Sequence, residues 1–278
     1  MRAHFLLACN EKSASQQDMG SLERLLGRTM LLVAHPDDET IGCGALLQRM
    51  REPVVVFLTD GAPRDPYFWS AYGSRENYAE VRAAEARNAL YRIGVSDLFF
   101  LHTDGGAIPD QELHLNLGLA YAGLFELITQ LRPEALLSSS YEGGHPDHDS
   151  CCFLASILAR QMNIPAWELP LYHRHGALIE MQKFLRTSGD EVRIVSTGDE
   201  LLLKRAMMGA YKSQYDTLKE FAPETEMFRP MMKHDFSRPP HPGKLNYETW
   251  GWKMTGQDLC RAFMDFQDAM AKQTRNAG

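Results

Sequence analysis

The tripeptide His-Pro-Asp occurs twice in this chain, at residues 35–37 and at residues 145–147. Each copy follows a short apolar run typical of a buried strand, at 29–34 and at 134–140. Each copy also precedes a pattern of apolar residues at helical spacing. This repetition of strand, motif and helix predicts an α/β fold, because strands that alternate with helices pair in parallel.

The rest of the chain continues the alternation. Further strands are predicted at 53–58, 97–101, 166–172 and 193–195, and helices at 41–50, 78–91, 113–131, 150–162, 199–215 and 256–272. The expected architecture is a Rossmann-like layered fold, with a mostly parallel sheet and helices on both faces. Ligands of such sheets bind at the carboxyl ends of the strands, where both motifs lie. Pro is favoured in the first helical turn, so each His-Pro-Asp is expected to open its helix.

Each motif carries a metal-capable residue at its fourth position, Asp38 in the first copy and His148 in the second. A catalytic zinc ion takes three protein ligands and keeps an open position. His35, Asp38 and His148 would supply that set, leaving Asp37 and His145 beside the metal as base and acid. Zn²⁺ is the expected metal, and Fe²⁺ is an alternative for two histidines and one carboxylate. The acidic residues could instead serve only as helix caps.

Composition restricts the classes of partner and the compartment. The net charge is −7 and no run of Lys or Arg is long, which argues against nucleic acid as a partner. No apolar run approaches the roughly 20 residues of a membrane span. The five cysteines are odd in number and lack C-x-x-C spacing, which is typical of reduced thiols and predicts a cytoplasmic protein.

Three parts are expected along the chain. Residues 1–28 form a polar lead-in, and residues 29–220 form the catalytic α/β domain. Residues 221–278 comprise an irregular segment and a final helix packed on the same domain. The irregular segment, 221–252, is interrupted by prolines but rich in aromatic residues, which disordered segments usually lack. We expect it to form a wall of the substrate cleft.

The segments 34–39 (Ala-His-Pro-Asp-Asp-Glu) and 144–148 (Gly-His-Pro-Asp-His) resemble the two signature motifs of the LmbE-like, or PIG-L, family of zinc-dependent N-deacetylases. A weaker likeness extends over residues 29–215 and includes Thr59-Asp60-Gly61 and Tyr211-Lys212-Ser213-Gln214. The long insert between Gly61 and Tyr78 departs from the shorter loops common in the family.

The resemblance implies a role for each motif residue. His35, Asp38 and His148 would bind zinc, Asp37 would be the general base, and His145 would be the electrostatic or acid catalyst. Asp147 would orient His145 or a metal ligand. The implied substrate and partner is a small-molecule amino sugar conjugate, an N-acetylglucosamine unit joined to a group such as an inositol, a lipid, malate or an antibiotic core. The oligomeric state is left open.

The chemistry implied is amide hydrolysis. Asp37 would take a proton from water, and an imidazolium at His145, favoured by nearby Asp147, would hydrogen-bond the oxyanion. Arg64 and Asp104 are candidate substrate contacts, although each could be a surface ion pair or a turn residue. Aromatic residues that could stack on a sugar or simply fill the core are Trp69, Tyr72, Trp250 and Trp252.

Several alternatives remain at this point. Gly42-Cys43-Gly44 could begin a dinucleotide-binding loop, but Leu47 occupies the place of the third glycine. Cys151 lies three residues after His148, but a buried thiol explains it more simply than a nucleophile. An amidase acting on a longer N-acyl group or on a thiol-conjugate amide, and a non-catalytic acyl-sugar-binding protein, also fit the motifs.

Overall fold

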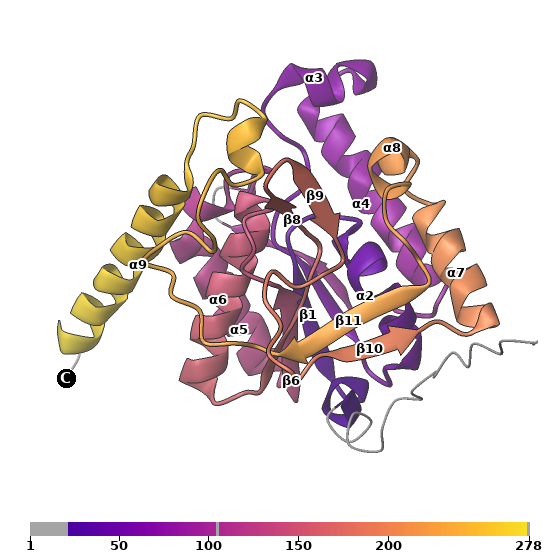
Figure 1. Ribbon diagram of the computed structural model, residues 1–278, viewed down its shortest axis with the longest axis horizontal. Coiled ribbons are helices and arrows are strands. Elements are labelled where there is room, and N and C mark those ends of the chain that lie inside the picture. The colour runs from indigo at the N-terminus through magenta and orange to yellow at the C-terminus, as the bar shows by residue number, and fades with distance from the viewer. Residues whose placement is uncertain (1–21, 104–105, 277–278) are drawn as a thin grey trace, which may run out of the picture.

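The computed structural model describes residues 22–103 and 106–276 (Figure 1). Its centre is a seven-stranded sheet with the strand order β10-β11-β7-β6-β1-β2-β3. Five neighbouring strands are parallel: β1 (Thr29–Val33), β2 (Val54–Phe57), β3 (Leu98–Phe100), β6 (Ala135–Ser139) and β7 (Ala166–Leu169). The predicted α/β class with a mostly parallel sheet is therefore confirmed.

Two antiparallel strands extend the sheet beyond β7. They are β11 (Thr225–Pro230), in which Arg229 pairs with Glu168, and β10 (Val192–Val195) at the edge. The sequence analysis missed strand β11, because Pro223 precedes it, Pro230 ends it, and the surrounding segment reads as irregular. Pro230 is its last residue, where a missing N–H costs the ladder little.

Two short hairpins lie outside the main sheet. One consists of β4 (His102–Thr103) and β5 (Gly106–Ala107), the other of β8 (Tyr172–His175) and β9 (Leu178–Met181). The single strand expected at 166–172 is divided between β7 and β8. Pro170 separates them, because it cannot donate a hydrogen bond to a ladder.

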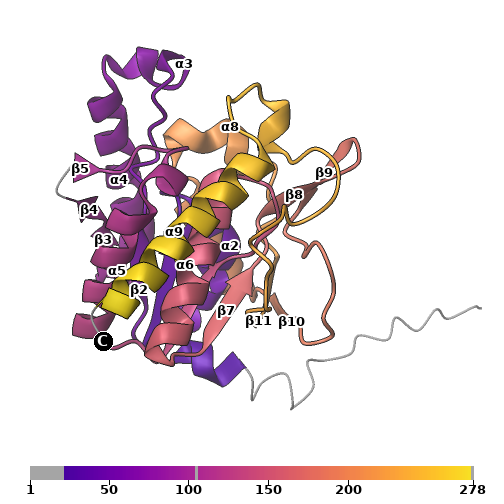
Figure 2. The same ribbon diagram turned by 90° about the vertical axis from the view of Figure 1, so that its left-hand side faces the viewer.

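Helices cover both faces of the sheet (Figures 1 and 2). One face carries α2 (Asp38–Arg49), α4 (Arg75–Tyr91) and α7 (Gly198–Met208), and the other carries α5 (Leu117–Leu131), α6 (Pro146–Met162) and α9 (Gly256–Asn276). Alternate strand residues point to opposite faces, so Leu31 and Val33 join the first core whereas Met30 and Leu32 join the second. The two cores explain why consecutive residues 30–33 of β1 are all apolar.

The remaining elements are short. They are η1 (Glu23–Leu26), α3 (Pro66–Trp69), η2 (Ser70–Tyr72), η3 (Leu113–Leu115), η4 (Lys212–Gln214), α8 (Tyr215–Leu218) and η5 (Tyr247–Thr249). The helix expected at 199–215 ends at Met208, because the chain turns at Gly209 before η4 and α8. Within the described residues, no helix is both long and apolar enough to cross a membrane.

Helix α2 has a kink at Cys43, where φ is −149° and ψ is 28°. The kink frees backbone groups that two buried side chains satisfy. Lys204 Nζ donates to the Ile41 carbonyl oxygen at 3.3 Å, and the Glu226 carboxylate accepts from the amides of Ala45 (2.6 Å) and Leu46 (2.9 Å). Lys204 and Glu226 also pair with each other at 2.6 Å. These contacts join β11, which carries Glu226, and α7, which carries Lys204, to α2.

The glycines of this kink have packing roles. A Cβ atom on Gly42 would lie 2.8 Å from the Leu169 side chain, and one on Gly44 would lie 3.1 Å from Lys204. Both glycines lie inside α2 and not in a loop before it. The pattern therefore belongs to a kinked helix and not to a dinucleotide-binding turn.

Candidate metal-dependent active site

The two His-Pro-Asp segments meet at one edge of the sheet. Strands β1 and β6 are parallel neighbours, so the segments that follow them emerge side by side. Asp38 lies between the two histidines of the predicted ligand set. Its Oδ2 is 3.3 Å from His35 Nδ1, and its Oδ1 is 3.2 Å from His148 Nε2. The structure thus brings together the three residues expected to bind the metal.

Asp110 is a fourth acidic group at this edge, which the sequence analysis missed. Its Oδ1 lies 3.0 Å from His35 Nε2 and 3.4 Å from His145 Nε2. Asp110 follows β5 in the loop after the third strand, the same edge at which both motifs lie. That position is a weak signal by itself, because acidic residues are common in loops after strands.

Two overlapping groups of side chains can hold a metal ion here. One consists of His35, His145 and His148, and the other of His35, Asp110, His145 and Asp147; in each, the potential ligand atoms lie within 4.8 Å of one another. Nδ1 of His148 is buried without a hydrogen-bond partner in the described structure, and Nε2 has only the 3.2 Å contact with Asp38 Oδ1. Burying such atoms unpaired is costly, and imidazole and carboxylate donors suit zinc or iron(II). The residues therefore fit a divalent metal. Of the expected ligands, His35 and His148 belong to the first group, whereas Asp38 belongs to neither group and contacts both histidines.

The two segments differ in where their helices begin. Helix α6 begins at Pro146 as expected, and the ring of its N-cap residue His145 accepts a hydrogen bond from the Asp147 amide (3.1 Å, to Nδ1). Helix α2 begins only at Asp38, so the expectation that Pro36 opens it is wrong. Asp37 has a φ of 134°, which places Pro36 in a turn before the helix.

Arg82 and Gly61 hold that turn. The Arg82 guanidinium donates to the Asp37 carboxylate (2.9 Å, to Oδ2), to the Pro36 carbonyl (2.7 Å) and to the Gly61 carbonyl (2.7 Å). Gly61 has a φ of 66°, and a Cβ atom there would lie 2.8 Å from the Pro36 ring. Arg82 therefore sets the position of Asp37.

Glu39 also stabilises the turn that contains Asp37. Its carboxylate accepts from the Asp37 amide at 3.0 Å and from the Tyr211 hydroxyl. Ser213 donates to Glu85 through its amide (2.9 Å) and its hydroxyl (2.6 Å). The weak likeness at residues 211–214 thus corresponds to contacts that join α4 and the motif helix.

Asp147 contacts His35 and does not reach the His145 ring through its carboxylate. The carboxylate accepts from the amides of Gln111 (2.6 Å) and Leu113 (3.0 Å), and Oδ2 lies 3.3 Å from His35 Nε2. Of its two expected roles, orienting His145 or orienting a metal ligand, the geometry favours the second. Asp147 also holds the loop that carries Asp110.

Burial and neighbouring charges shift the pKa values of these groups. Burial raises the pKa of Asp37 to about 7, against the opposing effect of Arg82. For Asp38 burial acts in the same direction, but His148 and His35 outweigh it and hold the pKa well below its usual value. Burial lowers the pKa of His145 to about 3, and the nearby carboxylates do not reverse this. The imidazolium expected at His145 is therefore not the resting form of the chain alone.

A cavity of about 530 Å³ is lined by the candidate metal ligands His35, Asp38 and His148. Its polar end contains Asp37 and the proposed ligands, and aromatic side chains form much of its wall: Tyr67, Phe68, Tyr172, Phe221, Trp250 and Trp252. The Trp252 ring lies 5.1 Å from that of His145, centroid to centroid. Of the aromatic residues proposed to stack on a sugar, Trp250 and Trp252 line this cavity and Trp69 and Tyr72 do not.

The two proposed substrate contacts have different outcomes. Arg64 does not line the cavity, and its side chain, 68% exposed, forms a two-point ion pair with Glu112. The geometry therefore favours the surface ion pair that the sequence left open. Asp104 lies outside the described residues.

Comparisons with known proteins agree with this geometry. Residues 30–159 match the family model described as PIG-L, GlcNAc-PI de-N-acetylase. A 1D-myo-inositol 2-acetamido-2-deoxy-alpha-D-glucopyranoside deacetylase of Nocardioides sp. is 29% identical over 173 residues, 52% of this chain and 57% of that protein. The chain spans about half the length of the curated relatives it matches.

Two solved structures share the fold. The A40926 pseudoaglycone deacetylase Dbv21 superimposes with a TM-score of 0.58 at 18% identity, over 75% of this chain and 98% of that one. The zinc-inhibited form of teicoplanin deacetylase Orf2 gives 0.53 at 15% identity, over 74% and 99%. The match of the family model covers both His-Pro-Asp segments, so the resemblance seen in the two motifs is confirmed over residues 30–159, which match the PIG-L family.

Proposed function

We propose that this protein is a metal-dependent hydrolase that removes the N-acetyl group from an N-acetylglucosamine-type conjugate. The observation that carries this proposal is the convergence of His35, Asp38 and His148 in a cavity that also contains Asp37. The names of the curated relatives, which are deacetylases of an acetamido-glucopyranoside of inositol, support the substrate class.

His35, Asp38 and His148 would hold the metal, with Asp110 as an additional acidic neighbour of His35. Zn²⁺ is the proposed ion and Fe²⁺ the alternative. When bound, such an ion lowers the pKa of a coordinated water and polarises the acyl carbonyl group.

Asp37 is the proposed general base. Arg82 occupies its Oδ2, whereas Oδ1 has no hydrogen-bond partner among the described residues. A carboxylate held in this way can accept the proton of the attacking water. It can then return that proton to the departing amine, so that acetate and a free amino sugar leave.

His145 is proposed to stabilise the oxyanion. Its Nδ1 accepts from the Asp147 amide, so the proton of the neutral ring lies on Nε2. An Nε2–H group that faces the metal-binding residues can donate to the acyl oxygen as negative charge develops there. This favours the electrostatic role over the acid role for His145.

We infer that residues 221–278 belong to the same catalytic unit as residues 29–220. Trp250 and Trp252 come from the later segment and line the cavity, and Leu259 and Phe263 of α9 join the core beneath α6. Aromatic rings suit the apolar face of a pyranose, so these tryptophans are the proposed sugar-binding wall.

The test is acetate release from a panel of N-acetylglucosamine conjugates, with inositol, lipid, malate and antibiotic-type substituents. The protein is assayed as purified, after chelation, and after Zn²⁺ or Fe²⁺ is added back. Because one structural neighbour is described as a zinc-inhibited form, zinc is titrated from below one equivalent to excess. Metal-dependent release supports the proposal. If fully metallated protein releases no acetate from any conjugate but cleaves a longer N-acyl amide, the deacetylase proposal is wrong and the protein is an amidase for that longer acyl group.

A further inference from the structure

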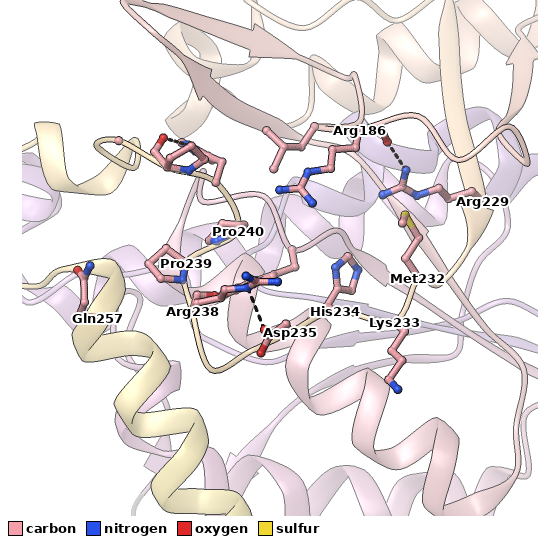
Figure 3. A pocket seen from close by; sticks show the side chains of 15 residues that line it. Arg186, Arg229, Met232, Lys233, His234, Asp235, Arg238, Pro239, Pro240 and Gln257 are labelled. Atoms are coloured by element: carbon pink, nitrogen blue, oxygen red, sulfur yellow. Dashed lines mark hydrogen bonds and ion pairs between the residues drawn. The ribbon is translucent and has the colours of Figure 1, made fainter.

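A second cavity, about 650 Å³ in volume, lies apart from the metal centre and shares no lining residue with its cavity (Figure 3). It lies between the segment after β9, the end of β11 and the stretch from residue 232 to residue 243. Its volume is within the range of small-molecule sites.

The lining of this cavity is basic. It contains Arg186, Arg229, Lys233 and Arg238 but only one carboxylate, that of Asp235. The whole chain has a net charge of −7, so the sign of the charge is reversed locally. Charges of one sign gathered in a concave surface raise the local concentration of oppositely charged ligands.

Arg229 forms a rigid wall of the cavity. It is 2% exposed, its Nε donates to Glu168 Oε1 at 2.6 Å, and its guanidinium stacks 3.8 Å from the Phe184 ring centre. Glu168 Oε2 also lies 2.6 Å from His234 Nε2. The charge of Arg229 is therefore balanced by Glu168, and Arg229 does not need an anionic ligand.

Arg186 has no such partner. Its guanidinium forms no hydrogen bond or ion pair within the described part of the chain, although its side chain lines the cavity. Arg238 reaches in from the opposite side and shares its charge with Asp235 at 2.9 Å (Figure 3). His241 Nδ1 lies 3.0 Å from the Pro242 carbonyl oxygen, and its Nε2 is buried and unpaired in the described structure. Because His241 Nδ1 donates to that carbonyl, Nε2 of the neutral ring is an acceptor, so the unused donors of the cavity are those of Arg186.

We propose that this cavity binds a small molecule carrying a phosphate group, with Arg186 and Arg238 as its main contacts. A planar guanidinium donates two parallel hydrogen bonds to such a group. Two guanidiniums from opposite sides match an anion with three terminal oxygens better than a carboxylate, which one arginine satisfies. This inference does not depend on the deacetylase activity.

The test is calorimetric titration of the metal-loaded protein with inorganic phosphate at low ionic strength. Arg186→Gln should weaken binding about tenfold, the equivalent of one charge-assisted pair. Arg193→Gln is the matched control. Arg193 is exposed on β10 and lines neither this cavity nor that of the metal centre, and its side chain forms no hydrogen bond or ion pair among the described residues. It should leave the affinity within about twofold of the wild type.

Three outcomes would overturn the proposal. They are equal affinities for the two variants, binding that disappears when the metal is chelated, and succinate binding as tightly as phosphate. The second outcome would place the phosphate at the metal centre. A further variant, Arg238→Gln, should also weaken binding, and thermal unfolding of each variant checks that the fold is retained.

Discussion

The two His-Pro-Asp segments have the same three residues but use the third one differently. Asp37 lies in a turn before its helix, lines the active-site cavity and pairs with Arg82. Asp147 lies inside the first turn of its helix, is 0% exposed and accepts from the backbone of residues 111 and 113. Asp37 is accessible from the cavity, whereas Asp147 is buried and its carboxylate holds the loop at residues 111–113.

The cause of this difference is the point at which each helix starts. Asp37 precedes α2, with a φ of 134°, whereas Asp147 is the second residue of α6. The fourth residues, Asp38 and His148, nevertheless meet at 3.2 Å. Identical motifs thus supply two proposed metal ligands at their fourth positions but place their third residues differently.

The largest expected effect is the loss of metal from variants of Asp38 and His148, the fourth residues of the two segments. His148→Ala and Asp38→Ala should each reduce the metal content and remove metal-dependent acetate release, because each would delete one of the three proposed ligands. Metal analysis of purified protein measures this. His102→Ala, at an exposed position on β4, is the control and should keep its metal. Full metal occupancy in either ligand variant would refute the proposed ligand set.

The next effect separates the third positions by activity. Asp37→Asn should lower kcat by about 10²–10⁴-fold while the metal remains bound, because the variant lacks a base. Asp216→Asn, in an exposed ion pair with Lys219, is the control and should leave kcat unchanged. The assay is single-turnover acetate release at saturating metal. An Asp37→Asn enzyme with near-normal kcat would assign the base elsewhere.

The third effect concerns Asp147, whose removal should reduce the stability of the fold. Asp147→Ala should lower the free energy of unfolding by about 1–3 kcal/mol for each backbone amide left unpaired, those of Gln111 and Leu113. Urea unfolding of metal-free protein measures this without a contribution from the metal. Asp147→Asn keeps one acceptor oxygen and should recover part of the loss. Equal stability of the alanine variant and the wild type would contradict a structural role for Asp147.

The smallest effect concerns the turn that makes Asp37 different. Gly61→Ala should cost about 1–3 kcal/mol, because φ there is 66° and the added Cβ would lie 2.8 Å from Pro36. Gly118→Ala is the control, since Gly118 lies exposed in α5 with no atom near the added Cβ. It should be neutral or slightly stabilising. A loss of the same size in both variants would show that the Gly61 turn is not specifically strained.

Much of the fold could be predicted because the parallel strands are buried on both faces. Residues 30–33 and 135–137 are apolar for that reason, and the motif after each strand falls at the carboxyl edge of the sheet. Strand β11 could not be recognised in the same way. Its Glu226 and Arg229 are polar but buried, because they pair with Lys204 and Glu168, which lie far away in the sequence.

The sequence by itself determined the local units: the strands, the helices that follow them, and three metal-capable residues at a recognisable spacing. Only the tertiary structure decided that Asp110 joins the site, that Arg82 aims Asp37, and that Asp147 holds a loop. The physical reason is that these roles depend on hydrogen bonds and charges between distant segments. A spacing along the chain records which residues are near in sequence, but the packing of the sheet determines which of them meet.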